Sequence, residues 1–388
     1  SGCGTTGDPT TGESAAAEST AATPPAKPAS PALSREFKRL GRGWQRIEPA
    51  GDTACSDGSP FAFFVRRGEP EKLLFYLQGG GACWNNATCD PLLQPTYSQR
   101  APETFPENYD GIFNYRRSDN PFADHTVVFV PYCSADVHIG DATVRYERSA
   151  GALDKIREKT GSDDPIETSY AIEHRGFANV GAALDWTFAN VTAPRSILVT
   201  GSSAGSIPSP YYALRIARHY DNARIVQLGD AAGGYRRSEQ TGNPNTVWNT
   251  VPRLQQDPAY TALTDDNFTY EQLYIMAAAA APNVAFAAYD AAEDDVQKRF
   301  LALSGVEMPS LKGAIDANQN DIRAAVDEFV SYIAGGDSHT ILARPEFYTF
   351  TVGDYPVRKW VDDLAQGKTI PSVSCSNCAQ AEILGGGD

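Results

Sequence analysis

The chain has 388 residues, 41% of them hydrophobic, and 33 basic against 48 acidic side chains give it a net charge of −15. A chain of this length and apolar content can bury one large core, so a single large catalytic domain is expected. The negative charge argues against nucleic acid and anionic lipid surfaces as partners, because both select positive patches.

The first 34 residues differ in composition from the rest. Residues 4–32 are nearly all Gly, Ser, Thr, Ala, Pro and Glu, with no large apolar side chain, so they cannot offset the entropy of ordering. Ser1–Gly4 resembles the end of a bacterial lipobox, which predicts Cys3 as a lipidated first residue; the alternative is a free cysteine at an arbitrary chain start. We therefore expect a disordered tether over 1–34, a catalytic domain over 35–388, and membrane attachment only through Cys3.

A strand-like run leads into a glycine loop. Leu73–Leu77 is uninterruptedly apolar, and three consecutive glycines follow at 79–81. Glycines leave backbone N–H groups unshielded, so such a loop can close on an anionic oxygen. We assign Gly80 and Gly81 to an oxyanion hole and the nearby Trp84 to the mouth of the pocket. A flexible hinge or a phosphate loop is the alternative, although the P-loop and dinucleotide fingerprints are both missing.

The pattern G-x-S-x-G occupies Gly201–Gly205, between a strand-like run over 196–200 and a helix-like run over 211–218. This order predicts a nucleophile elbow, a sharp turn that lifts a serine hydroxyl out of the sheet. Ser203 is then the nucleophile, and the N–H of Ala204 is a further donor of the oxyanion hole.

The general base must be a histidine. In hydrolases with such an elbow the chain order is nucleophile, acid, histidine. Only His219 and His339 follow Ser203 in the chain, so only these two can be the base. His219 would lie roughly 24 Å from the nucleophile along the helix that follows the elbow, at about 1.5 Å per residue. The sequence therefore predicts His339 as the base. The other histidines are His125, His138 and His174.

Two carboxylates are candidates for the acid. Asp290 ends a strand-like run over 284–288, and Asp230 ends another over 224–228. Both would lie at the carboxyl edge of a parallel sheet, where α/β ligand sites form. The acidic run Glu293–Asp295 instead indicates a solvated helix N-terminus. Before His339, a helical segment is expected over 321–333.

Three segments together resemble the signature blocks of the pectin acetylesterase and Notum family. They are Leu77–Trp84, Pro131–Ser134 followed by Asp136–Gly140, and Gly201–Gly205. The resemblance extends over roughly residues 40 to 370. It implies a secreted α/β-hydrolase, with a mostly parallel central sheet and helices on both faces, that cleaves acyl esters without metal or cofactor. The chain departs from the family at Ser202, usually cysteine in plant members, and at Ser206 and Ala135, where glycine is preferred.

The resemblance also implies roles for single residues. The family's acid occupies a strand end like that of Asp290, so Asp290 is expected to be the triad acid, with Asp230 holding the elbow or lining the pocket. His339 is similar to the family's histidine. No metal is expected, because a serine triad leaves it no task. The remaining pocket residues expected are Asp136, His138 and Ser202.

Seven cysteines are present, and six remain without Cys3. The family implies a bond from Cys55 to the cysteine of the Pro-Tyr-Cys strand, Cys133. Cys83 in the first block and Cys89 just after it enclose a five-residue loop, which leaves the C-terminal cysteines to pair with each other. Three disulfides imply an oxidising compartment. The C-terminal C-x-x-C could instead be redox-active or half a zinc site, although the βα context and a second ligand pair are missing. The expected pairs are Cys55–Cys133, Cys83–Cys89 and Cys375–Cys378.

Together these features predict a monomeric, exported serine carboxylesterase. It would remove short acyl groups, acetyl foremost, from an extracellular substrate such as an acetylated polysaccharide. One alternative is a hydrolase of other acyl esters or polyesters with a more open cleft. The other is a catalytically silent relative that binds glycans.

Overall fold

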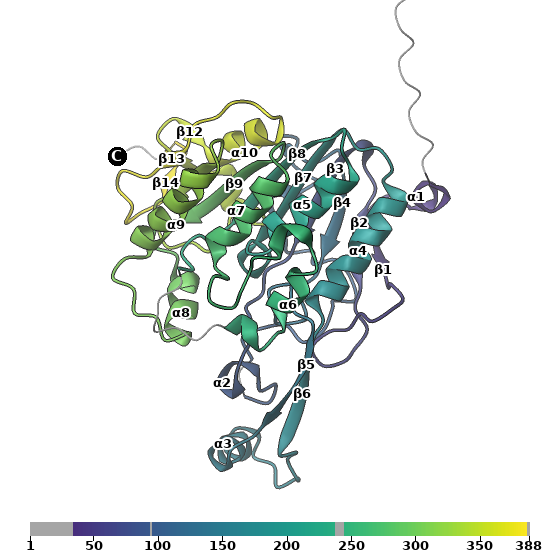
Figure 1. The fold of residues 1–388 in the computed structure, drawn as a ribbon, viewed down its shortest axis with the longest axis vertical. Helices are drawn as coiled ribbons and strands as arrows, with labels where there is room; N and C mark the ends of the chain where they lie inside the picture. Colours follow the sequence, from purple (N-terminus) through teal and green to yellow (C-terminus); the bar gives the residue numbers. More distant parts are fainter. Residues whose placement is uncertain (1–33, 94, 237–243, 386–388) are drawn as a thin grey trace, which may run out of the picture. The chain divides into compact units, whose positions relative to one another are not determined.

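The structure is a computed structural model that describes residues 34–385, apart from residue 94 and residues 237–243. The expected tether and Cys3 lie outside these residues. Nine strands form one sheet in the order β1-β2-β4-β3-β7-β8-β9-β10-β13 (Figure 1). Every neighbouring pair from β4 to β13 is parallel, whereas β2, near one edge, runs antiparallel to both of its neighbours, β1 and β4.

The strands of this sheet are β1 (Trp44–Ile47), β2 (Phe63–Arg66), β3 (Glu69–Leu77), β4 (His125–Val130), β7 (Ser196–Ser202), β8 (Arg224–Asp230), β9 (Ala285–Ala291), β10 (Val330–Ala334) and β13 (Val373–Ser374). Two small sheets contain β5 (Ala142–Glu147) with β6 (Ser169–His174), and β11 (Phe350–Val352) with β12 (Tyr355–Pro356) and β14 (Glu382–Ile383). The helices are α1 (Arg35–Arg39), α2 (Asn86–Cys89), α3 (Ala150–Thr160), α4 (Gly176–Asn190), α5 (Ser209–His219), α6 (Thr250–Leu254), α7 (Tyr270–Ala280), α8 (Asp295–Leu303), α9 (Leu311–Ala325) and α10 (Val357–Ala365).

The central strands are apolar because both faces of the sheet are covered. Along β3, Leu73, Phe75 and Leu77 belong to one buried cluster, while Leu74 and Tyr76 belong to another. Helices α4, α5, α7 and α9 supply the first cluster and lie over one face of the sheet (Figure 1), and α10 supplies the second. This arrangement is an α/β-hydrolase-like fold, as expected.

One expected element is wrong. The helix anticipated over 321–333 ends at Ala325, and Val330–Ala334 forms β10 instead. Strand β10 pairs in parallel with β9 on one side and with β13 on the other. Tertiary pairing therefore decides the conformation of this short apolar run, whose length and pattern fit a buried helix or a strand equally well.

Three disulfides link the expected partners: Cys55–Cys133, Cys83–Cys89 and Cys375–Cys378. The last closes a short C-terminal loop against the end of β10. There the N–H of Cys375 donates to Ile333 O (2.9 Å), and the N–H of Gly336 donates to Cys378 O (3.0 Å). Such bonds indicate an oxidising, extracytoplasmic compartment. No helix within the described residues is long and apolar enough to cross a bilayer.

Candidate active site

Strand β7 ends at Ser202, and the next residue, Ser203, has a backbone φ of +55°. A left-handed backbone is uncommon outside glycine, and at the end of a strand it marks the strained turn of a nucleophile elbow. A Cβ on Gly201 would clash with the carbonyl of Gly205, and a Cβ on Gly205 would clash with that of Leu77. The two glycines thus allow the close approach that presents the Ser203 hydroxyl. A 3-10 turn over Ser203–Gly205 precedes α5, so the α-helix begins later than a direct strand-to-helix junction would place it.

The glycine loop lies against this serine. Strand β3 pairs with β7, with Leu77 opposite Gly201, so the loop after β3 starts beside the elbow. A Cβ on Gly79 would lie 2.8 Å from Ser203 Cβ, and one on Gly81, where φ is +81°, would clash with Thr96 O. The loop therefore tolerates no side chain at these positions, and its backbone faces the nucleophile.

His138 supports the glycine loop from behind. Its Nε2 lies 2.7 Å from the carbonyl of Gln78, the residue before the glycines. Burial lowers the pKa of His138 to about 4, so the ring is neutral and Nε2–H donates this hydrogen bond. The side chain of Gln78 in turn accepts the N–H of Tyr132 (2.9 Å).

Asp136 belongs to the same support. Its carboxylate accepts the Ser134 hydroxyl (2.6 Å) and the N–H groups of Gly176 (2.7 Å) and His138 (3.2 Å). Burial raises the pKa of Asp136 to about 7. Asp136 is 0% and His138 1% exposed, and neither lines a described cavity, so the expectation that they line the substrate pocket is wrong. Their polar atoms form hydrogen bonds with the loops that carry the site.

His339 faces a carboxylate that the sequence did not single out. Its Nδ1 lies 2.7 Å from Oδ2 of Asp294, the N-cap residue of α8. The other oxygen, Oδ1, accepts the N–H groups of Val296 (2.9 Å) and Gln297 (3.0 Å). With Nδ1 engaged, Nε2 is the ring nitrogen available to a reacting group.

Asp290 does not reach His339. Strand β9 continues to Ala291, and Asp290 Oδ1 accepts the N–H of Gly233 (2.8 Å) and of Gln297 Nε2 (3.1 Å). The turn after β9 is instead hydrogen-bonded to the loop after β10, through Ala292 N to Ala334 O, Glu293 N to Gly336 O and Asp295 N to Asp337 O. This pairing of the two turns places Asp294, four residues beyond Asp290, beside the histidine. The expectation that Asp290 orients His339 is therefore corrected.

Asp230 joins the elbow to the histidine loop. Its carboxylate accepts the Ser202 hydroxyl (2.6 Å) and the N–H groups of Ile341 (3.0 Å) and Leu342 (3.0 Å). Tyr76 donates in turn to the Ser202 hydroxyl (2.9 Å). Burial raises the pKa of Asp230, which is 0% exposed and lines neither cavity. It holds the elbow, one of its two expected roles, and does not line the pocket.

Two cavities meet at Ser203, and both Ser203 and Gly81 line each of them. The first has about 1000 Å³ of empty space, part of it open to solvent, and Ala204 also lines it. Its walls are mainly apolar and include Trp84, Ile207, Trp248, Phe268, Leu273 and Phe300.

The second cavity, of about 1140 Å³ and also partly open, has more polar walls. His339, Ser202 and Gly80 line this cavity, and none of the three lines the first. Its polar walls also include Gln78, Asn108, Tyr109, Arg344 and Glu346.

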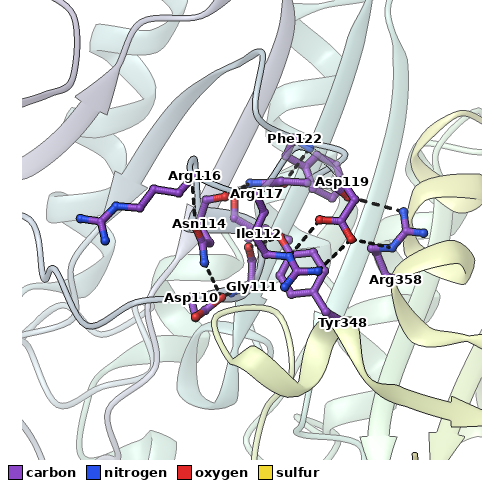
Figure 2. A network of polar contacts seen from close by, with 11 residues as sticks. Asp110, Gly111, Ile112, Asn114, Arg116, Arg117, Asp119, Phe122, Tyr348 and Arg358 are labelled. Carbon is purple, nitrogen blue, oxygen red and sulfur yellow. Dashed lines mark hydrogen bonds and ion pairs between the residues drawn. The ribbon is translucent and has the colours of Figure 1, made fainter. Parts of the chain in front are cut away.

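Figure 2 shows a polar network among residues that follow Tyr109 and Glu346 in the chain, two residues that line the second cavity. Arg117 donates two hydrogen bonds to Asp119, both 2.9 Å, and its guanidinium lies 3.7 Å from the centre of the Tyr348 ring. The Tyr348 hydroxyl donates to Gly111 O (2.8 Å), and the N–H of Ile112 donates to Leu342 O (2.8 Å). The segment after Tyr109 is thereby attached to the loop that carries His339.

The described residues contain no group of three or more His, Cys, Asp or Glu side chains placed to hold a metal ion. Sequence reasoning placed Trp84 at the pocket, where it lines the first cavity, but missed Asp294, Gln297 and the other apolar walls of that cavity. For Asp294 a signal was present, because an aspartate just before a helix is a preferred N-cap.

Comparison with known proteins places these features in context. A model of the pectinacetylesterase family matches residues 46–270. The human palmitoleoyl-protein carboxylesterase NOTUM is 34% identical over 91 residues, which cover 22% of this chain and 18% of the human protein. The inactive palmitoleoyl-protein carboxylesterase notum1b of Danio rerio is 30% identical over 104 residues, which cover 26% of this chain and 75% of that protein.

The fold is also similar to that of a solved structure. The Wnt deacylase Notum from Drosophila has a TM-score of 0.60 at 17% identity, over 87% of this chain and 97% of that chain. At this identity the likeness concerns the fold. The sequence match to human NOTUM spans about a fifth of that relative's length.

Proposed function

Because the chain belongs to the pectinacetylesterase family, we propose that it hydrolyses acyl esters with Ser203 as nucleophile, His339 as base and Asp294 as acid. Family and relatives make it a carboxylesterase or deacetylase. The observation that carries the assignment of residues is the strained Ser203 in one cavity with His339, whose Nδ1 is bound by a buried carboxylate.

The reaction follows from this geometry. His339 Nε2 takes the proton of the Ser203 hydroxyl as its oxygen attacks the ester carbonyl. The N–H groups of Gly80, Gly81 and Ala204 hold the oxyanion that develops. The imidazolium then gives its proton to the leaving alcohol, and water, activated by the same nitrogen, releases the acid from the acyl-enzyme. Asp294 fixes the tautomer of His339 and stabilises the imidazolium.

The position of His339 decides which part of the ester each cavity takes. The imidazolium must reach the oxygen of the leaving alcohol, so the alcohol lies on the side of His339, in the second cavity. The acyl chain then enters the first cavity, which His339 does not line. The polar second cavity suits a hydroxyl-rich alcohol such as a glycan, in keeping with the expected polysaccharide.

The apolar walls of the first cavity favour an acyl group longer than the acetyl anticipated from sequence. An acetyl methyl would contact little of that wall, whereas each further methylene that enters contributes up to about 0.8 kcal/mol, about fourfold in kcat/KM. Two relatives are named for the palmitoleoyl group, which agrees with this direction.

The test is a series of p-nitrophenyl esters from acetate to decanoate. We expect kcat/KM to rise with chain length and then level off. Ser304→Trp, which narrows the first cavity without touching Ser203, should lower turnover of the long esters and spare the acetate. If kcat/KM of the unaltered chain instead fell steadily from acetate onward, acetyl esters would be the favoured substrates.

A catalytically silent glycan-binding relative is the competing function, and one similar protein is named inactive. Labelling by a serine-reactive fluorophosphonate probe, lost in Ser203→Ala, would exclude it. We further propose that the exported chain is anchored through a lipid on Cys3; mass spectrometry of the envelope-bound protein would detect the acylated N-terminal peptide.

A further inference from the structure

Gln297 in α8 contacts three separate parts of the site through one buried amide. Its Oε1 accepts the N–H of Gly234 (2.8 Å), and its Nε2 lies 3.1 Å from both Asp290 Oδ1 and Asp294 Oδ2. The N–H of Gly234 requires an acceptor, so the orientation of the amide is determined by its partners. Both hydrogens of Nε2 therefore point to carboxyl groups.

The Asp294 carboxylate is held by four donors. Oδ1 accepts the N–H groups of Val296 and Gln297, while Oδ2 accepts His339 Nδ1–H and the Gln297 side chain. Without the Gln297 amide, Oδ2 would keep only the histidine as a partner, and one of the four restraints on rotation of the carboxylate would be lost. Gln297 thus restricts the geometry on which the tautomer of His339 depends.

Asp290 lies at the other end of this amide in a different environment. Its Oδ2 has no hydrogen-bond partner among the described residues, and a Cβ on Gly233 would clash with this oxygen. The charged groups that face it are the carboxyls of Asp294 and Asp230, and burial together with them raises the pKa of Asp290 to about 7. Four tyrosines also face it, each with a raised pKa and hence neutral: Tyr235, Tyr270, Tyr274 and Tyr289.

We propose that Gln297 and Asp290 are positioning residues of the triad: Gln297 fixes the Asp294 carboxylate against His339, and Asp290 secures Gln297 as a neutral carboxylic acid. The proposal rests on the proposed function. A neutral acid fits the site because Oδ1 can accept from Gly233 and Gln297 while the proton resides on the unpartnered Oδ2. A second buried negative charge on the same amide would be unfavourable.

The role of Gln297 is tested by a double-mutant cycle with Asp294. Gln297→Leu should lower kcat roughly 10- to 100-fold and leave KM within about twofold, the range for loss of a supporting partner. In an Asp294→Asn background the same change should cost nothing further, because Gln297 acts through Asp294. Additive losses would overturn the proposal, and Gln297→Met provides a second substitution should the leucine variant not fold.

The protonation of Asp290 is tested by comparing two substitutions. At pH 6, below the pKa of about 7 of Asp290, Asp290→Ala should lower kcat about tenfold, and Asp290→Asn should restore it, because a neutral carboxamide replaces a neutral acid. If Asn were as harmful as Ala, the proposal would be wrong.

Thermal stability gives a readout independent of catalysis. The pKa of Asp290 is about 7 in the folded chain and about 3.9 in the unfolded chain, so the unfolded state loses its proton first as pH rises. The contribution of Asp290 to the free energy of unfolding is therefore fully present below about pH 4 and is lost as the pH rises from about 4 to 7. The Tm of Asp290→Asn relative to wild type should therefore climb over that interval and then level off, and a constant difference would contradict a neutral Asp290.

The two proposals fail separately. If Ser203→Ala retained turnover, the proposed hydrolase mechanism would be wrong, but the pH dependence of Tm in Asp290→Asn would still show whether Asp290 is neutral. If Ser203→Ala abolished turnover and the Gln297 cycle was additive, only the positioning role would fall.

Discussion

The nucleophile half of the site and its acid–base half are built in different ways. Ser203 and the glycine loop come from the ends of β7 and β3, which are paired strands, and Gly201 and Gly205 set their approach from within the motif itself. His339 and Asp294 come from turns after β10 and β9, and these turns are joined by backbone hydrogen bonds and by buried side chains outside any motif. The first half is therefore specified by two local sequence motifs carried on neighbouring strands, while the second depends on contacts outside any motif.

The largest effect should come from the local half. Ser203→Ala should reduce kcat by roughly 10⁴-fold or more, because it removes the group that forms the covalent intermediate. Steady-state hydrolysis of p-nitrophenyl butyrate measures this. Ser206→Ala is the matched control, since the buried Ser206 hydroxyl has no hydrogen-bond partner among the described residues and turnover should stay near wild type. Residual turnover within about tenfold of wild type would disprove the nucleophile.

Removing the charge of Asp294 should come next. Asp294→Asn should lower kcat about 10³- to 10⁴-fold, because the amide favours the wrong tautomer of His339. The neighbouring Asp295 has a side chain that is 73% exposed, so Asp295→Asn should leave kcat within about twofold. Equal effects at the two positions would show that local charge, and not the contact with His339, matters.

The glycine loop can be disturbed without touching a reacting side chain. Gly81→Ala should lower kcat roughly 10²- to 10³-fold, the cost of losing an oxyanion donor, because the new Cβ would clash with Thr96 O. Gly43 also has a positive φ but has nothing near its Cβ position, so Gly43→Ala should lower only Tm. If both variants lost only stability, the loop would have no part in the chemistry.

The smallest effect is expected where the two halves are joined. Asp230→Asn leaves one oxygen to serve three donors, which should cost about 1 to 3 kcal/mol of stability and lower kcat about tenfold through displacement of the His339 loop. Ser202→Ala removes one of those donors and should do less. A full loss of activity with unchanged Tm would instead give Asp230 a direct role in the reaction.

This contrast also explains what could be read from the sequence. The elbow, the glycine loop, the strands that carry them and the three disulfides all follow from local patterns or from the family resemblance. His339 was identifiable from chain order together with helix geometry, which excluded His219. The structure places each of these where the sequence indicated.

The missing parts share a physical cause. Asp294 belongs to an acidic run that fits an ordinary helix start, and only the pairing of its turn with the loop after β10 brings it to His339. Asp290 satisfied every local criterion for the acid except that β9 continues past it. Asp136 and His138 belong to one of the segments that carry the family resemblance. Their side chains are buried, because their hydrogen bonds go to neighbouring loops and not to the cavities.

The C-terminal disulfide loop supports the turn that carries His339. Its backbone hydrogen-bonds to Ile333 and Gly336, at the start of the turn that carries His339, while the elbow has no contact of this kind with it. Reduction of Cys375–Cys378 alone would leave Ser203 in place and remove part of the support of the His339 turn. If His339 is the base, reduction of this disulfide should therefore slow ester turnover more than it disturbs the elbow.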